Sequence, residues 1–305
     1  MTDWLLLILP LLIGWLLDLL LGDPAWLPHP VVGFGKMIGF GEKRLNKGSH
    51  RMLKGGLLAV SLILLVLGFV WALRMVLGSY TLYFDMIAIF YCLAGTTLIR
   101  EVRDVFLAVN RSLEEGRKQV ARIVGRDTSE LSAQEIRTAA LETLAENLSD
   151  GVIAPLFWLA IGGVPAMVAY KMVNTLDSMI GYRTEQYKDF GCWAAHIDDI
   201  ANYIPARLTA LLMVISAGKP QLAGFVWRNG RHHASPNSGY PEAALAGILD
   251  CRFGGPHYYF GELFDKPYIG ENARELTTAD MQKAVRINRT AEVLAVISVM
   301  IINCL

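Results

Sequence analysis

Acidic and amide side chains recur at helical spacing between residues 142 and 207, beside strongly apolar runs. Residues four apart share one face of a helix, so each recurrence places polar groups side by side. Like charges on one face repel, and holding them beside apolar sequence raises their energy further. The three sets are Glu142, Glu146 and Asp150; Lys171, Asn174 and Asp177; and Asp198, Asp199 and Asn202.

A bound cation would relieve this repulsion. Mg²⁺ fits best, because proteins hold it with a few carboxylates together with the phosphate oxygens of a substrate. The alternative is that these are solvated helix faces with ordinary caps, because single motifs match by chance. Three sets within one short region favour the magnesium site.

A turn-rich loop precedes an apolar helix at residues 231–242, RHHASPNSGYPE. Ser, Asn and Gly followed by Pro241 predict a tight loop with proline in the first turn of a helix. Free backbone N–H groups at such a helix start suit a phosphate, and Arg231 and His233 lie beside them. A well-capped helix without a ligand is the alternative, since such turns are common.

Composition places the chain among membrane proteins. Of its 305 residues, 53% are hydrophobic and only 18% are charged, with a mean hydropathy of +0.38. The formal net charge is zero, so nothing supports nucleic-acid binding. The four cysteines contain no C-x-x-C pair, so neither a disulfide framework nor a zinc site is predicted.

We predict an all-α fold, a polytopic integral membrane protein with about four spans and cytoplasmic helical loops. The basic loop over residues 22–54 belongs in the cytoplasm by the positive-inside rule. Ser132 and Glu135 form a capping box that opens the helix carrying Glu142 and Glu146. The chain is then expected to turn at residues 149–151. The predicted spans lie near residues 4–21, 55–77, 84–99 and 291–305.

The apolar run over residues 153–180 raises a topological question, because a straight span would separate the first polar set from the other two. Gly162, Gly163 and Pro165 lie at its centre and would break a helix. We therefore predict a re-entrant hairpin, which is tolerated where protein buries the broken backbone. Residues 204–217 are too short to span and are expected to form a half-inserted helix. The whole chain, 1–305, would be one membrane-embedded catalytic domain with its active site facing the cytoplasm.

Five stretches of this sequence together resemble the CobD/CbiB family, the adenosylcobinamide-phosphate synthases of cobalamin biosynthesis. They extend from Asp18 to Leu249 and so cover most of the chain. The stretches are DLLLGDPAWLPHPVVGFGKMI, ENLSDGVIAPLFW, YKMVNTLDSMIGY, DDIANYIPARLT and HHASPNSGYPEAALAGIL.

The resemblance implies a C–N ligase of the inner (plasma) membrane. Such an enzyme joins a propionate carboxylate of the corrinoid adenosylcobyric acid to the amine of aminopropanol or aminopropanol phosphate, with ATP and Mg²⁺. Membrane lipid surrounds it, and self-association or association with other corrinoid-pathway enzymes stays open. ATP would convert the carboxylate to an acyl phosphate that the amine attacks. No P-loop or kinase-type glycine pattern occurs, so an ATP site would be unconventional.

Roles follow for the polar residues. Mg²⁺ and the protonated amine are assigned to Glu146, Asp150, Asp177, Asp198 and Asp199. The residues expected to neutralise phosphate charge as the transition state develops are Lys171, Arg207, Arg231 and His233. Either Asp177 or Asp199 would accept the proton of the amine, so the expected catalytic residues are Asp177, Asp199, Lys171 and Arg207. Further substrate contacts are expected from Asp23, His29, Asn147, Asn174, Asn202, Ser235, Asn237, Ser238 and Glu242.

Two other functions are open. A UbiA-like prenyltransferase also binds Mg²⁺ and diphosphate on Asp/Asn-rich helices, but that fold needs about eight or nine regular spans of roughly twenty residues. A transporter or a non-catalytic scaffold of the corrinoid pathway would also use broken helices and buried acids. Inverted repeats would favour the transporter, and the sequence has none.

Overall fold

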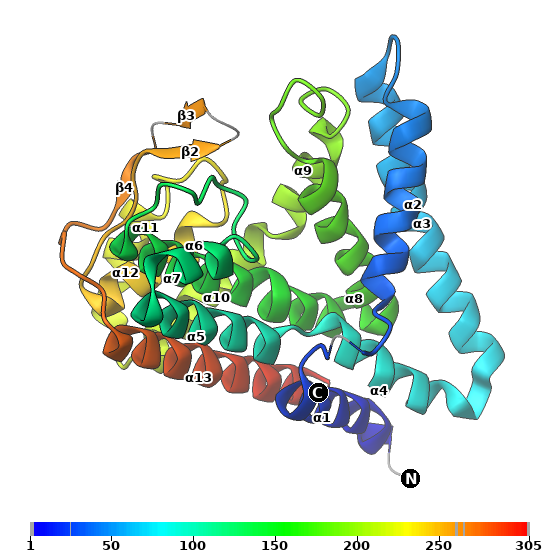
Figure 1. Cartoon of the computed structure of the whole chain (residues 1–305). Helices are drawn as coiled ribbons and strands as arrows, with labels where there is room; N and C mark the ends of the chain where they lie inside the picture. The colour runs from blue at the N-terminus through cyan, green and yellow to red at the C-terminus, as the bar shows by residue number, and fades with distance from the viewer. Residues whose placement is uncertain (1–2, 25, 260–261, 265, 304–305) are drawn as a thin grey trace. The chain divides into compact units, whose positions relative to one another are not determined.

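The computed structural model describes residues 3–24, 26–259, 262–264 and 266–303 (Figure 1). The chain divides into two compact units, each assembled from separate stretches of sequence. Unit 1 comprises Met1–Ala94, Ala154–Asn202 and Val296–Leu305. Unit 2 comprises Gly95–Ile153 and Tyr203–Ala295. The single-domain organisation stays a prediction, and we describe each unit by itself.

Helices make up almost all of the regular structure. Unit 1 contains α1 (Asp3–Leu21), α2 (Pro30–Leu45), α3 (Arg51–Leu77), the 3₁₀ turn η1 (Gly78–Tyr80), α4 (Thr81–Cys92), α8 (Ala154–Ile180) and α9 (Cys192–Ala201). The helices of unit 2 are α5 (Gly95–Arg111), α6 (Leu113–Val120), α7 (Ala133–Leu148), the π-helical turn η2 (Ser149–Ile153), α10 (Tyr203–Ser216), the 3₁₀ turn η3 (Pro220–Leu222), α11 (Ala223–Asn229) and α12 (Gly239–Leu249). Helix α13 (Thr278–Ile302) belongs to unit 2 up to Ala295.

Four short strands in unit 2 are the exception to the predicted all-α fold. Strand β1 (Phe253–Gly254) pairs antiparallel with β4 (Tyr268–Ile269). Between them, β2 (His257–Tyr259) and β3 (Glu262–Phe264) form a second antiparallel pair. The rest of the regular structure described is helical, so the predicted class is confirmed apart from this small addition.

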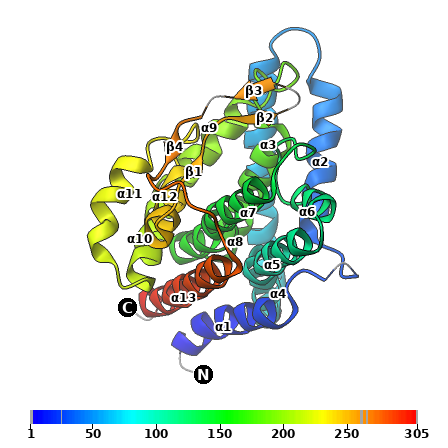
Figure 2. The same cartoon turned by 60° about the vertical axis from the view of Figure 1, so that its left-hand side comes forward.

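Helix α8 is central to unit 1, where it packs against α2, α3, α4 and α9. Helices α2 and α3 run side by side, as both views show (Figures 1 and 2). The outer face of α3 exposes large apolar side chains, among them Leu64, Phe69 and Trp71. Two helical stretches of the described chain, Arg51–Arg111 and Ala133–Ile180, are long and apolar enough to cross a membrane. These features are those of an all-α membrane protein.

Two of the predicted spans differ from the observed helices. The helix expected near 84–99 ends at Cys92 and a new helix starts at Gly95, because Leu93 is extended (φ −91°, ψ 143°). Gly95, the first residue of α5, packs closely against Glu292 within unit 2, since a Cβ added to this glycine would lie 3.1 Å from Glu292 Oε1. The helix expected near 291–305 begins much earlier, at Thr278. Spans 4–21 and 55–77 correspond closely to α1 and α3.

The predicted break inside residues 153–180 is present. Gly162 (φ −133°, ψ 17°) and Gly163 (φ 66°, ψ −165°) leave the helical region, and the positive φ of Gly163 favours glycine. Helix α8 therefore consists of two segments. A re-entrant path for them stays a prediction, as does half-insertion of residues 204–217. The latter form α10, whose 14 residues extend about 21 Å, less than the roughly 30 Å hydrocarbon core.

Helix α7 is at the centre of unit 2, packed against α5, α6 and α12, while α12 also packs against α10 and α11. The predicted capping box opens it: Ser132 N donates to Glu135 Oε2 (2.8 Å), and Glu135 N donates to Ser132 Oγ (3.3 Å). The turn expected at residues 149–151 is wrong. The chain instead continues through the π-helical turn η2, whose backbone stays hydrogen-bonded, directly into α8.

Candidate functional site

A cluster of two acids and neutral donors lies where α8 and α9 meet in unit 1. Asp198, on α9, is only 8% exposed. Asn202 Nδ2 donates to Asp198 Oδ2 at 3.0 Å, and Asn202 Oδ1 accepts from Tyr170 Oη of α8 at 2.8 Å. Asn174, one turn beyond Tyr170, also donates to the carboxylate. We call Tyr170, Asn174, Asp177, Asp198 and Asn202 the amide cluster.

Burial is the main electrostatic influence on this cluster. It raises the pKa of Asp198 to about 7, and the nearby charge of Asp177 raises the pKa further, against the hydrogen bond from Asn202. Amides stabilise a carboxylate less than a cation would, so they do not offset the loss of water. Asp198 can therefore gain or lose a proton near neutral pH.

The three acids predicted to act together in unit 1 do not share one setting. Consecutive residues on a helix lie about 100° apart, and Asp199 is accordingly influenced by His196 and Arg183 rather than by the amides. Burial raises the pKa of Asp199, and those two cations lower it. Asp177 is held by a close turn at Gly181, where an added Cβ would lie 1.9 Å from Asp177 Oδ1.

A cavity of about 630 Å³ in unit 1, lined mostly by apolar residues, brings together three other predicted residues, Asp23, His29 and Lys171. His29 Nδ1 caps α2 by accepting from Val31 N at 3.2 Å. Its Nε2 lies 3.4 Å from Asp23 Oδ1, and the ring of Tyr91 meets the imidazole edge-on at 5.2 Å between centroids.

In unit 2, three carboxylates gather between α7 and the start of α12. Glu142 is buried, with Arg126 Nη2 at 2.5 Å from Oε2 and the backbone N of Gly254 at 2.6 Å from Oε1. Glu146 Oε1 accepts from Ser238 Oγ at 2.7 Å. Glu242 is the third. We call Glu142, Glu146, Glu242 and His233 the glutamate cluster.

Burial again decides protonation in the glutamate cluster. It raises the pKa of Glu242 well above its usual value, and the charges of Glu142 and Glu146 raise it further. His233 Nε2 lies 3.8 Å from Glu242 Oε1, and burial lowers the pKa of His233 more than Glu146 raises it. Burial therefore favours the protonated form of Glu242 and the neutral form of His233.

The loop before α12 satisfies its own backbone donors. His233 Nδ1 accepts from Ser235 N (3.0 Å), and Ser235 Oγ accepts from Asn237 N (3.2 Å) and Ser238 N (3.4 Å). The expectation that these N–H groups are free to bind phosphate is therefore wrong, because side chains of the loop fold back onto them. The predicted helix start is confirmed, with Pro241 in the first turn of α12.

Arg207 holds this loop in place. Its guanidinium lies between the rings of Tyr203 (3.7 Å) and Tyr240 (4.1 Å). It donates to Asn237 Oδ1 at 2.8 Å and to the carbonyl of Pro236 at 3.0 Å. These contacts favour a positioning role over the predicted catalytic one.

Other predicted residues of unit 2 lie outside both clusters. Asn147 donates to the carbonyl of Thr143 in its own helix at 3.0 Å. Arg231 is exposed and stacks over Trp227, 4.8 Å from the ring centroid. Asp150 is half-buried in η2.

The described residues contain no group of three or more His, Cys, Asp and Glu side chains that could hold a metal ion by themselves. Of the five predicted metal ligands, Asp177, Asp198 and Asp199 belong to unit 1, and Glu146 and Asp150 belong to unit 2. The five-carboxylate set stays a prediction. Asp177 and Asp198 nevertheless offer hard oxygen donors, and Mg²⁺ commonly uses one or two carboxylates with phosphate oxygens.

Comparison with known proteins identifies the family. A sequence profile described as CobD/Cbib protein matches residues 11–288. This chain belongs to the CobD/CbiB family. It is 45% identical over 293 residues to cobalamin biosynthesis protein CobD of Geobacter metallireducens, covering 92% of both chains. It is 40% identical over 297 residues to cobalamin biosynthesis protein CbiB of Salmonella arizonae, covering 93% of both. No solved structure shows significant similarity to it.

The profile of the CobD/CbiB family spans both clusters, yet sequence reasoning missed some of their members. Tyr170 lies four residues before Asn174, a spacing that could have assigned it to the same face. Glu142 was recognised as part of a set but given no role. Arg126 had no local signal, because its partner Glu142 lies sixteen residues away.

Proposed function

We propose that this chain catalyses the amide-forming step of cobalamin biosynthesis. Its substrates would be adenosylcobyric acid, aminopropanol or aminopropanol phosphate, and ATP. Membership of the CobD/CbiB family supports a role in this pathway, and the match over residues 11–288 is the observation that carries the proposal. Relatives that cover more than nine-tenths of the chain bear names from the same pathway.

The chemistry requires activation of a carboxylate. A carboxylate oxygen is a poor leaving group, so we infer that it attacks the γ-phosphorus of ATP, forming an acyl phosphate and releasing ADP. The amine then attacks the acyl carbon, inorganic phosphate leaves, and the amine loses one proton. Charge develops on phosphate oxygens in the first step and on the acyl oxygen in the second, so nearby positive groups accelerate both.

The amide cluster supplies groups for this chemistry. Asp177 and Asp198 would hold Mg²⁺, which when bound neutralises phosphate charge. Asp199, turned away from that pair toward His196 and Arg183, would accept the proton of the amine. Asn174 and Asn202 donate to the carboxylate of Asp198 and would orient it.

The glutamate cluster has a different part in the proposal. Arg231 and His233 would contact phosphate oxygens, and Arg207 would fix the loop that carries them. Lys171 instead lines the cavity of unit 1 that contains Asp23 and His29. The basic loop over residues 22–54 supports a site that faces the cytoplasm from the inner membrane.

Purified full-length protein in detergent tests the proposal directly. It would receive adenosylcobyric acid and Mg-ATP, with aminopropanol in one reaction and aminopropanol phosphate in another. Mass spectrometry should detect the corresponding amide and stoichiometric ADP. Tight corrinoid binding without amide or ADP in either reaction would contradict the proposal and favour a non-catalytic scaffold.

A further inference from the structure

Lys171 lies where two cavities of unit 1 adjoin. The first is the cavity of about 630 Å³ whose lining includes Asp23 and His29. The second, of about 470 Å³, is lined almost wholly by apolar side chains of α2, α3, α4 and α8. Val31, Tyr91 and Lys171 line both cavities, so the two adjoin. We call the second cavity the apolar groove.

Among the described residues Lys171 has neither an ion-pair nor a hydrogen-bond partner for its ammonium group, although the side chain is half-buried. An ammonium beside apolar surface without a counter-charge is unfavourable, so this position suits an anion. Asp23 lines the same cavity but is paired with His29 rather than with Lys171. Lys171 and Asp23 therefore place a positive and a negative group in one cavity without pairing with each other. Such an arrangement complements a zwitterion, a ligand that carries one charge of each sign.

The apolar groove opens on the outer surface of unit 1. Three side chains that line it, Leu65, Phe69 and Ile87, are 54%, 63% and 53% exposed. Two of them belong to α3, which lies in a stretch apolar enough to cross a membrane. In a bilayer this opening faces hydrocarbon, so an acyl chain can enter from the side.

We propose that the two cavities together bind phosphatidylethanolamine. One acyl chain lies in the apolar groove, the lipid phosphate contacts the ammonium of Lys171, and the lipid ammonium is directed toward Asp23. This inference goes beyond the proposed function, since it involves neither ATP nor a corrinoid. Lys171 would then bind the phosphate of a lipid instead of the phosphate that is transferred in the reaction.

The same head-group chemistry, an ammonium and a phosphate on neighbouring carbons, also occurs in a free amino alcohol phosphate. The apolar groove decides between the two sources, because a free amino alcohol phosphate has no chain to occupy it. Binding that depends on groove residues therefore indicates the lipid, and binding that ignores them indicates the small molecule.

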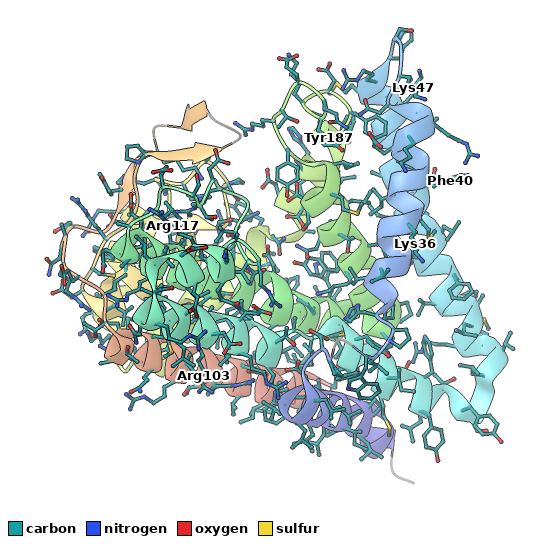
Figure 3. The ribbon with its side chains drawn as sticks, viewed as in Figure 1. Lys36, Phe40, Lys47, Arg103, Arg117 and Tyr187 are labelled. Atoms are coloured by element: carbon teal, nitrogen blue, oxygen red, sulfur yellow. The ribbon has the colours of Figure 1, made fainter. Side chains whose placement is uncertain are left out.

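Native mass spectrometry of the full-length protein in detergent can measure this binding. The ligands are phosphatidylethanolamine, phosphatidylcholine and phosphoethanolamine. Lys171→Met removes the cation, and Ala88→Trp fills the groove. Lys36→Met is the matched control, since Lys36 lies on the exposed face of α2 beside Phe40 (Figure 3).

We expect Lys171→Met to weaken phosphatidylethanolamine binding about tenfold, because one charge-assisted contact is lost. Ala88→Trp should weaken binding about as much, because it blocks the acyl chain from the groove. Lys36→Met should leave binding unchanged. Phosphatidylcholine, whose methylated amine cannot donate to Asp23, should bind more weakly than phosphatidylethanolamine. Ile87→Trp repeats the test at an exposed groove position if Ala88→Trp does not fold.

Three results would overturn the proposal: equal binding of both lipids by all variants, no lipid retained by the wild type, or phosphoethanolamine bound as tightly as the lipid and unaffected by Ala88→Trp. The last would assign the cavity of Asp23 and His29 to a free amino alcohol phosphate. Because no ATP or corrinoid is present, none of these outcomes depends on whether the chain synthesises the amide.

Discussion

The two buried acidic clusters of this protein are stabilised in opposite ways. In unit 1, Asp198 accepts hydrogen bonds from two amides, one of which also accepts from the phenol of Tyr170, and burial raises the pKa of Asp198 to about 7. In unit 2, Glu142 pairs with Arg126 and a backbone N–H, and burial raises the pKa of Glu242 well above its usual value. Both clusters remove carboxylates from water, but only the second supplies a positive charge to offset that removal.

The difference indicates which cluster is suited to change state. A carboxylate held by neutral donors gains or loses a proton, or accepts a cation, at little cost, because its neighbours do not carry a compensating charge. A carboxylate in a buried ion pair is fixed, since loss of its partner leaves an isolated charge. The amide cluster therefore suits a reacting site, and the glutamate cluster suits the support of a loop.

Breaking the buried ion pair of the glutamate cluster should have the largest effect on stability. Arg126→Met leaves Glu142 buried without its cation, so we expect the free energy of unfolding to fall by about 3–5 kcal/mol. Thermal unfolding in detergent measures this. Arg122→Met is the control: Arg122 is 63% exposed and pairs with Glu101 at the surface, so about 1 kcal/mol or less is expected. Equal losses in the two variants would contradict the account.

Removing the titrating acid of the amide cluster should mainly affect activity. Asp198→Asn keeps the shape of the side chain but removes the charge, so amide formation should fall at least about 100-fold. The reconstituted assay measures it, with Asp104→Asn as an exposed control on α5. Wild-type turnover by the Asp198 variant would remove the amide cluster from the reaction.

The raised pKa of Asp198 also predicts how stability depends on pH. Between the usual carboxyl pKa of 3.8 and about 7, the unfolded chain has lost this proton while the folded chain keeps it. Folded protein then binds more protons, so stability falls as pH rises through this window, by at most about 1.4 kcal/mol per pH unit.

Unfolding midpoints of wild type and Asp198→Asn, compared from pH 4.5 to 7.5 in metal-free buffer, isolate this contribution. The wild-type curve should decline relative to the variant and become parallel to it above pH 7. Parallel curves throughout would show that Asp198 titrates at its usual pKa.

The smallest effect is expected where burial already favours the protonated acid. Glu242→Gln imitates the protonated acid, so the free energy of unfolding should change by about 1 kcal/mol or less at pH 7. Glu142→Gln removes a charge that Arg126 needs and should destabilise more, by about 3 kcal/mol. A larger loss in Glu242→Gln than in Glu142→Gln would reverse the assignment of the proton.

Features that depend on local sequence could be predicted here, and features that depend on distant partners could not. The capping box at Ser132 and the break at Gly162 and Gly163 follow from neighbouring residues, and both are present. Helical spacing likewise placed Asp198 with Asn202.

Tertiary contacts account for what the sequence did not show. Apolar composition continues through Leu93, so nothing local marks the end of α4 there. The donors of the loop before α12 looked free because their acceptors, His233 Nδ1 and Ser235 Oγ, depend on how the side chains fold back. Asp198 and Asp199 looked equivalent, but burial gives them different neighbours.

The fate of the carboxylate oxygen tests the proposed reaction most directly. Adenosylcobyric acid labelled with ¹⁸O in its reacting carboxylate would be converted with Mg-ATP and the amine, and the released phosphate analysed by mass spectrometry. Activation through an acyl phosphate predicts one ¹⁸O atom in each phosphate released. Amide formation with unlabelled phosphate would contradict it.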